Sequence, residues 1–277
     1  MLPAKPTAQP QRSALNVRLV GIGAAAPDTR VTNQQLESVV ETSDEWIKQR
    51  TGIGCRHLLQ PGEGLTGLAS TAVTRALDQA GVAAEDVELL ICATSTPDDL
   101  FGDAAGVARA AGATKAVAFD LTAACSGFLF GVNTASQFLH NGAYKTAVVV
   151  GADAMSRWVN WEDRNTCVLF GDGAGAAVIK AAEAGEQPGL LGYEMHSNGK
   201  GRTHAPHAHR HTPIARPHRT HRTSLPRCLL YRSRPRAATP ATLAGSLTRV
   251  HVYQATTSTS STTARRACSV SPTRSPR

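Results

Sequence analysis

Residues 118–132, AFDLTAACSGFLFGV, place a cysteine where a cysteine can react. A strand-like run at 116–121 ends in small residues, and an apolar pattern with helical spacing begins just after Cys125. The first N–H groups of a helix lack partners within the helix, and its dipole favours negative charge there, so a cysteine at this place is favoured as its thiolate. The spacing predicts a nucleophile for acyl groups. The alternative is an inert cysteine in a tight strand-to-helix joint.

Strands and helices alternate around this cysteine, which predicts an α/β fold with a parallel or mixed sheet covered by helices on both faces. The predicted strands are 16–23, 87–93, 116–121, 146–151 and 190–196. The predicted helices are 33–40, 44–50, 65–80, 101–111 and 125–141, with glycine caps at Gly52 and Gly81. Segments 167–170 and 174–181 flank a predicted glycine-rich turn at 171–175.

The composition changes sharply near residue 202. Residues 202–277 hold fourteen Arg and no Lys, Asp or Glu, and subtracting these charges from the net charge of +8 leaves −6 for residues 1–201. The tail has no helical or alternating periodicity, so it cannot bury enough apolar surface to offset its ordering entropy. The sequence therefore predicts a leader (1–15), a folded body (16–201) and a basic tail (202–277). We expect this tail to be disordered or translated out of frame. Sequencing the transcript across codon 202 tests the second alternative.

Six scattered cysteines form no CxxC pair and no metal-ligand spacing, which favours a reducing compartment without a disulfide framework or a metal site. His204, His207, His209 and His211 are closely spaced, but a Pro/Arg-rich segment fixes no geometry, so a metal site there is the weaker interpretation. No apolar run is long enough to span a bilayer. The acid-free leader is typical of a transit-peptide remnant or of a disordered terminus.

Five motifs in order resemble one known family. They are TSDEWIKQRTGI (42–53), ATSTPDDLFGDA (93–104), AFDLTAACSGF (118–128), VVVGADAMSRWVNWEDRNTC (148–167) and LFGDGAGAAV (169–178). Together they are similar to β-ketoacyl-acyl carrier protein synthase III, most of all to its plastid and cyanobacterial branch. The resemblance implies a thiolase-like layered fold whose first half is intact and whose second half is largely missing or replaced. It also implies the plastid stroma as location, with a bacterial-type cytoplasm as the alternative.

The resemblance implies an activity as well. Members of this family start type II fatty-acid synthesis by condensing acetyl-CoA with malonyl-acyl carrier protein, as homodimers without a permanently bound cofactor. Cys125 matches the residue that accepts the acetyl group, which suits a thiolate because a thioester stays reactive toward a carbon nucleophile. Trp46 and Arg164 match the pair that stacks on the CoA adenine, and Arg50 resembles a contact to a CoA phosphate.

Four further positions follow from the same resemblance. Thr42, Leu169 and Phe170 resemble walls of the CoA channel, and Phe101 resembles the residue that crosses the dimer interface and limits acyl-chain length. Each has an ordinary alternative in core, interface or surface packing. The glycine run 171–175 has no lysine and no GKS or GKT ending, so it predicts close backbone packing rather than a phosphate loop.

The sequence also departs from this family. It contains neither the His-Gln-Ala-Asn motif nor the Gly-Asn-Thr-Ser-Ala motif that donate to the malonyl thioester carbonyl in the family. The synthase therefore competes with a catalytically incomplete paralogue that binds CoA or dimerises. Non-specific nucleic-acid binding by the Arg-rich tail is weaker still, because the tail has few aromatic residues. Half a thiolase fold would also leave one apolar face without cover.

Overall fold

The computed structural model describes residues 15–197. The predictions for the leader, for the tail beyond residue 202 and for the tail histidines lie outside this range. Among the helices within it, none has the length and hydropathy needed to cross a bilayer.

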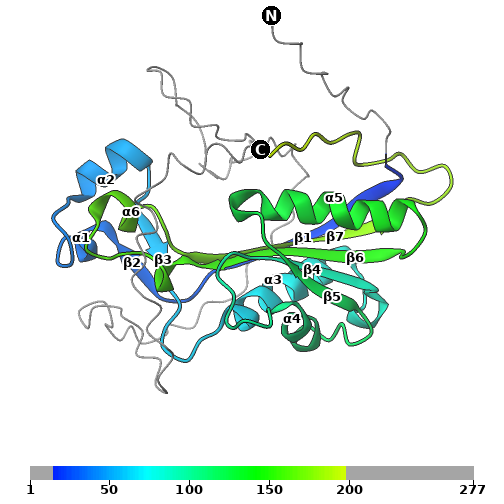
Figure 1. The fold of residues 1–277 in the computed structure, drawn as a ribbon, viewed down its shortest axis with the longest axis horizontal. Coiled ribbons are helices and arrows are strands. Elements are labelled where there is room, and N and C mark those ends of the chain that lie inside the picture. Colours follow the sequence, from blue (N-terminus) through cyan, green and yellow to red (C-terminus); the bar gives the residue numbers. More distant parts are fainter. Residues whose placement is uncertain (1–14, 198–277) are drawn as a thin grey trace, which may run out of the picture. The chain divides into compact units, whose positions relative to one another are not determined.

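A five-stranded mixed sheet forms the centre of the described part (Figure 1). Its strands, in the spatial order β1-β7-β6-β4-β5, are β1 (Val17–Ala25), β7 (Asp172–Ala181), β6 (Thr146–Ala154), β4 (Leu89–Ala93) and β5 (Val117–Leu121). Strand β4 is parallel to β5 and to β6, whereas β7 is antiparallel to both β6 and β1. The predicted mixed α/β sheet is confirmed.

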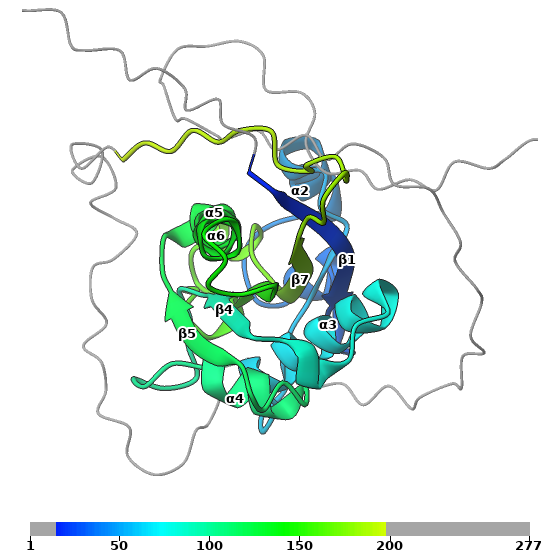
Figure 2. The same ribbon diagram turned by 90° about the vertical axis from the view of Figure 1, so that its right-hand side faces the viewer.

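Helices cover both faces of this sheet. Helices α3 (Leu65–Ala80) and α4 (Ala104–Ala110) lie on one face and α5 (Gly127–His140) lies on the other (Figure 2). Leu90 and Cys92 belong to the core under α3 and α4, while Leu89 and Ile91 belong to the core under α5. All five residues of β4 are buried because both of its faces are covered, which explains its continuous apolar sequence.

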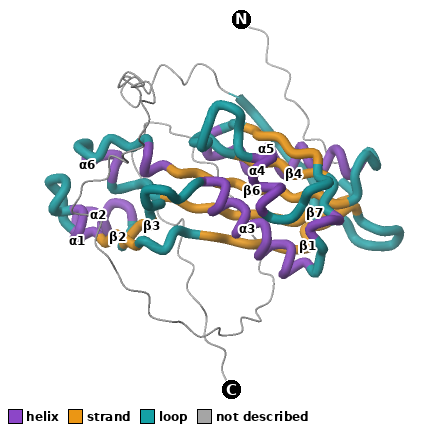
Figure 3. Tube along the Cα trace, turned by 90° about the horizontal axis from the view of Figure 1, so that it is seen from below, coloured by secondary structure: helices purple, strands orange, loops and turns teal. Residues whose placement is uncertain are grey.

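A small lobe lies at one end of the sheet, as Figures 1 and 3 show. It consists of β2 (Arg30–Thr32), α1 (Asn33–Leu36), α2 (Asp44–Thr51), β3 (Cys55–His57) and α6 (Arg164–Cys167). Leu36, Ile47, Leu58 and Trp161 form its own buried core. Because α6 comes from a segment more than 100 residues after α2, this lobe exists only once the sheet has brought the two segments together.

The glycine-rich segment predicted as a turn is a strand instead, and that prediction is wrong. Residues 172–175 begin β7, where Gly173 pairs with Asp153 and Gly175 with Gly151 of β6. The predicted close packing is present at Gly171, where an added Cβ would come within 2.9 Å of the Arg56 Cβ. Neighbouring strands on both sides therefore override the local turn preference of glycine.

Other boundaries also differ from the predictions. The helix predicted over 33–40 ends at Leu36, and the helix predicted over 101–111 begins at Ala104, which leaves Phe101 in the preceding loop. The strand predicted at 190–196 does not form, although Leu190 makes an isolated bridge with Leu15 and Tyr193 is a further bridge residue. Segment 167–170 completes and follows α6. Helix α3 has the predicted bounds, and Gly81 ends it in the left-handed conformation with φ of 61°.

Close packing of α3 on β1 yields the first prediction. A Cβ on Gly23 would lie 2.2 Å from the Ala72 carbonyl oxygen and 2.5 Å from the Ala76 nitrogen, both backbone atoms of α3. We expect Gly23→Ala to lower the free energy of unfolding by about 2 kcal/mol or more, because α3 must move off the sheet. Urea denaturation measures this change.

The matched control is Gly67→Ala on the same helix α3, where an added Cβ would meet nothing within 4 Å. There the loss of glycine is expected to raise the free energy of unfolding by up to about 1 kcal/mol. Equal shifts in the two variants would show that the close approach of α3 to β1 does not limit stability.

Candidate active site

The carboxyl ends of the three parallel strands β4, β5 and β6 lie at the same end of the sheet (Figure 1). The segments that follow them are 94–103, 122–126 and 155–171. These segments carry Phe101, Cys125 and Arg164, respectively. Ligands of open α/β sheets bind outside the carboxyl ends of the strands, so three predicted site residues come from the expected end of the sheet.

Cys125 lies in the 3-10 turn η2 (Ala124–Ser126), directly before the first residue of α5, and it is exposed. Ala124 has a φ of 47° and is the single non-glycine residue with positive φ in residues 15–197. This conformation costs roughly 1 kcal/mol for an alanine, and strained backbone of this kind clusters at functional sites. The turn presents the thiol at the surface of the described part of the chain. Ala124 was not among the predicted site residues, although the run of small residues 122–124 was a signal for a tight turn.

The other cysteines in the described range are less accessible. Cys92 and Cys167 are buried, and Cys55 is half-buried. Burial raises the pKa of Cys92, and the nearby carboxylate of Asp120 raises it further. Burial is also the main reason why the pKa of Cys167 is raised. Among these four thiols, Cys125 alone is open to a large reactant.

The aromatic ring of Trp46 is contacted by two arginines. The guanidinium carbon of Arg50 lies 4.4 Å from the ring centroid, one helical turn along α2, and that of Arg164 lies 5.1 Å away. The Nη1 atom of Arg164 also donates to the Glu41 carbonyl at 3.3 Å. The fold thus brings Trp46 and Arg164 together from distant segments. Both distances fall within the range of a cation–π contact.

Caps fix the two short helices that carry this cluster. The Ser43 hydroxyl accepts from the Trp46 N–H at 3.1 Å at the start of α2. The Asp163 carboxylate accepts from the Asn165 N–H at 3.0 Å at the start of α6. Hydrogen bonds from Asn165 and Thr166 hold the pKa of Asp163 below its usual value, so this cap is ionised at neutral pH.

The remaining predicted residues fall in two places. Leu169 and Phe170 directly follow α6 and are 46% and 36% exposed, and Thr42 precedes α2 with its hydroxyl oxygen buried and unpartnered among the described residues. These three residues belong to the lobe that carries Trp46. Phe101 is 95% exposed at the tip of the loop before α4, away from any described aromatic partner.

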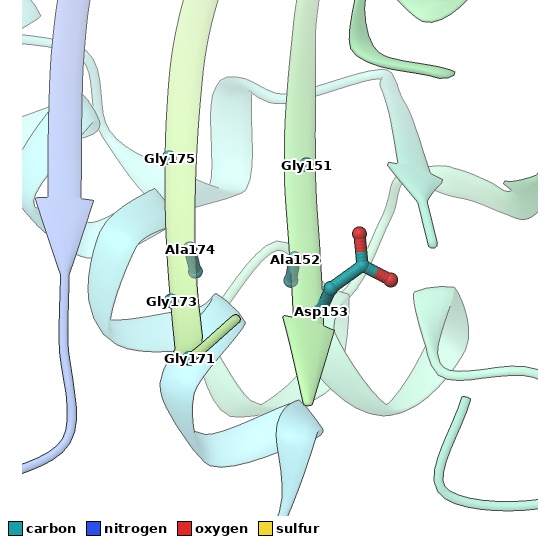
Figure 4. Close-up of a pocket in the computed structure, with 7 residues that line it drawn as sticks. All are labelled: Gly151, Ala152, Asp153, Gly171, Gly173, Ala174 and Gly175. Atoms are coloured by element: carbon teal, nitrogen blue, oxygen red, sulfur yellow. The ribbon is translucent and has the colours of Figure 1, made fainter. Parts of the chain in front are cut away.

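A shallow hollow lies over one face of the paired strands β6 and β7 (Figure 4). It is lined by Gly151, Ala152, Asp153, Gly171, Gly173, Ala174 and Gly175. Asp153 provides its single charged side chain, and this carboxylate accepts from the Ser95 N–H at 2.9 Å and the Thr96 hydroxyl at 3.0 Å. The hollow therefore offers space rather than reactive groups. Residues 15–197 contain no cluster of His, Cys, Asp and Glu arranged for a metal ion.

The mixed sheet with helices on both faces is a thiolase-like fold. A family model described as 3-oxoacyl-[acyl-carrier-protein (ACP)] synthase III matches residues 119–199. The β-ketoacyl-[acyl-carrier-protein] synthase III of Synechococcus elongatus is 57% identical over 189 residues, which are 68% of this chain and 56% of that protein. The protein of the same name from Gloeobacter violaceus is 58% identical over 183 residues, or 66% of this chain and 55% of the relative.

Solved structures agree with these sequence relatives. The synthase III of Pseudomonas aeruginosa superimposes with a TM-score of 0.62 at 37% identity, covering 67% of this chain and 56% of that one. The synthase III of Aquifex aeolicus gives a TM-score of 0.59 at 43% identity, covering 60% and 54%. The chain is a homologue of β-ketoacyl-acyl carrier protein synthase III, as its motifs predicted. It spans about half the length of the relatives that it matches.

The difference in exposure between the cysteines yields a second prediction. Iodoacetamide at neutral pH is expected to alkylate Cys125 well before Cys92 or Cys167, because burial shields these two thiols and keeps them protonated until the pH rises far above neutral. Peptide mapping by mass spectrometry gives the rate for each cysteine. A Cys125→Ser variant should lose the fast reaction among these three sites, and equally fast labelling of Cys92 would contradict the packing described here.

Proposed function

We propose that this chain accepts an acetyl group from acetyl-CoA on Cys125, as the first step of condensation with malonyl-acyl carrier protein at the start of fatty-acid synthesis. The observation that carries the proposal is the exposed Cys125 thiol before α5. It lies beyond the carboxyl ends of the parallel strands, as does Arg164 of the Trp46–Arg164 pair. The relatives that share these segments are named β-ketoacyl-acyl carrier protein synthase III, which supports this class of reaction.

The chemistry of the first step follows from a thiolate at this place. The Cys125 sulfur attacks the acetyl carbonyl carbon, a new carbon–sulfur bond forms, and the oxygen becomes an oxyanion. Collapse of this intermediate breaks the bond to the CoA sulfur, which leaves as a thiolate and takes a proton from solvent. We propose the backbone N–H of Cys125 as one donor to the oxyanion. The acetyl group then remains on Cys125 as a thioester.

The arginine and tryptophan recognise the nucleotide end of CoA in this proposal. Arg164 now lies 5.1 Å from the Trp46 ring, whereas an adenine stacked between the two groups requires two separations of about 3.5 Å each. Arg164 therefore has to move off the indole when CoA binds, and the base replaces the cation–π contact. Arg50, on the exposed side of α2, supplies positive charge for a phosphate.

Labelled acetyl-CoA tests this step. We expect the protein to gain one acetyl group, about 42 Da, on Cys125, and we expect Cys125→Ala to gain none at this site. Trp46→Ala should slow the labelling about tenfold, because a stacked aromatic contributes on the order of 1–3 kcal/mol for each base. Absence of label on wild-type Cys125 would refute the proposal.

A second function is favoured by a specific observation, namely that the sequence contains neither of the two motifs that serve the malonyl half-reaction in this family. In that case the chain takes the acetyl group but does not condense it. Adding malonyl-acyl carrier protein to the acetylated protein separates the two functions. Acetoacetyl-acyl carrier protein as product supports the complete synthase, and a stable acetyl-Cys125 supports the incomplete paralogue.

We also propose that the chain forms a homodimer through the edge of the sheet at β5. Strand β5 pairs only with β4 among the described strands, and its Val117 is 51% exposed. The neighbouring loop presents Leu100 and Phe101, which are 99% and 95% exposed. An open strand edge beside two exposed apolar side chains is suited to a second copy of the chain. Phe101 then reaches the acyl pocket of the partner.

Sedimentation velocity tests the dimer. Phe101→Ser is expected to weaken self-association at least about tenfold, since a buried aromatic is often a major contributor to an interface. Leu191→Ser is the matched control, because Leu191 is also exposed, at 72%, but lies after β7 and far from β5 in the sequence. A wild-type chain that sediments as a monomer at micromolar concentration would disprove the dimer.

A further inference from the structure

Asn33 is fully buried at the start of α1, and both polar atoms of its side chain form hydrogen bonds. Its Nδ2 donates to the Asp44 carboxylate at 2.9 Å and to the Ile53 carbonyl at 2.7 Å, at the two ends of α2. Its Oδ1 accepts from the Arg56 Nη1 at 2.9 Å. Hydrogen bonds from Lys48 and Asn33 lower the pKa of Asp44, which keeps this carboxylate ionised as an acceptor. Asn33 thus attaches α2 to β3.

Arg56 continues this chain of hydrogen bonds to the other side of the lobe. Its side chain is buried, with 5% of the residue exposed, and its Nη2 donates to the Val168 carbonyl at 3.0 Å, at the C-terminal cap of α6. It forms no ion pair with any carboxylate in residues 15–197, and its Nε has no partner there. Burial lowers the pKa of Arg56, because removing the guanidinium from water disfavours its charged form.

This hydrogen-bond network therefore joins α2 to α6 through four residues, Asp44, Asn33, Arg56 and Val168. These two helices carry the two sides of the adenine contact, with Trp46 on α2 and Arg164 on α6. Both helices are short, at eight and four residues, so neither is stable without contacts to the rest of the lobe. The apolar core of the lobe resists separation of the helices, but directional hydrogen bonds are needed to fix how they are turned toward each other.

We propose that Asn33 and Arg56 are positioning residues for CoA recognition, which set how the helices that carry Trp46 and Arg164 are placed relative to each other without touching the ligand. The inference rests on the proposed function. A buried arginine is costly to desolvate, and its planar fork reaches the Asn33 amide and the Val168 carbonyl at the same time. A shift of about 1 Å between two recognition groups is enough to lower a rate by a large factor.

Two acetyl donors distinguish positioning from general stability. Acetyl-CoA uses the adenine contact, whereas S-acetylpantetheine delivers the same acetyl group to Cys125 without an adenine. The ratio of the two rates of Cys125 acetylation in the full chain is independent of how much protein is folded. Arg56→Met, which keeps the bulk but removes both donated bonds, is expected to lower this ratio about tenfold and to leave the acetylpantetheine rate unchanged. Asn33→Leu should act in the same direction, and Arg56→Lys should restore part of the ratio.

The matched control is Arg30→Met, since Arg30 is an exposed arginine of the same lobe whose side chain, within residues 15–197, hydrogen-bonds only to the Cys55 sulfur. Its ratio should equal that of the wild type. A wild-type ratio near one would refute the adenine site and the inference with it. A large wild-type ratio that stays unchanged in Arg56→Met, or an equal loss with both donors, would refute the positioning role and leave the proposed function standing.

Discussion

Parallel pairing of β4 with both of its neighbours is the constraint on which the rest of the structure depends. Ile91 of β4 lies opposite Phe119 of β5 and Val149 of β6, so three strands run in the same direction. Parallel neighbours require crossover connections, and α4 and α5 provide them on opposite faces of the sheet. Each crossover returns the chain to the same starting edge, and for this reason the loops after the three strands all emerge at the other edge.

Hydrogen bonds then tie these loops to one another. The Asp120 carboxylate, in the strand that leads to Cys125, accepts from the backbone N–H groups of Asp103 and Ala104 at 3.0 Å each. An added Cβ on Gly102 would lie 2.3 Å from the same carboxylate, so the loop has to contain glycine at this point, where φ is 83°. The strand that delivers the nucleophile therefore also fixes the loop that presents Phe101. Burial of the apolar strands stabilises the sheet, and polar side chains such as Asp120 fix the position of the loop.

Local features were predictable where they depend on neighbours in the sequence. The bounds of α3 follow from its apolar period and from Gly81, and the end of α2 follows from Gly52, because left-handed caps favour glycine. The site residues Cys125, Trp46 and Arg164 came from motifs, and the structure places the Arg164 guanidinium over the Trp46 ring. In contrast, β7 was misread at its glycines, since its pairing with β1 and β6 involves residues far away in the sequence.

The sequence by itself determined the long helices and the apolar strands, the family resemblance and which cysteine precedes a helix, because periodicity, caps and motif order are properties of contiguous residues. Only the tertiary structure decided that Arg164 meets Trp46, that Arg56 is buried between α2 and α6, and that Ala124 takes a strained turn. Such contacts join segments up to about 120 residues apart. Their geometry depends on how the completed sheet brings those segments together, which local patterns do not encode.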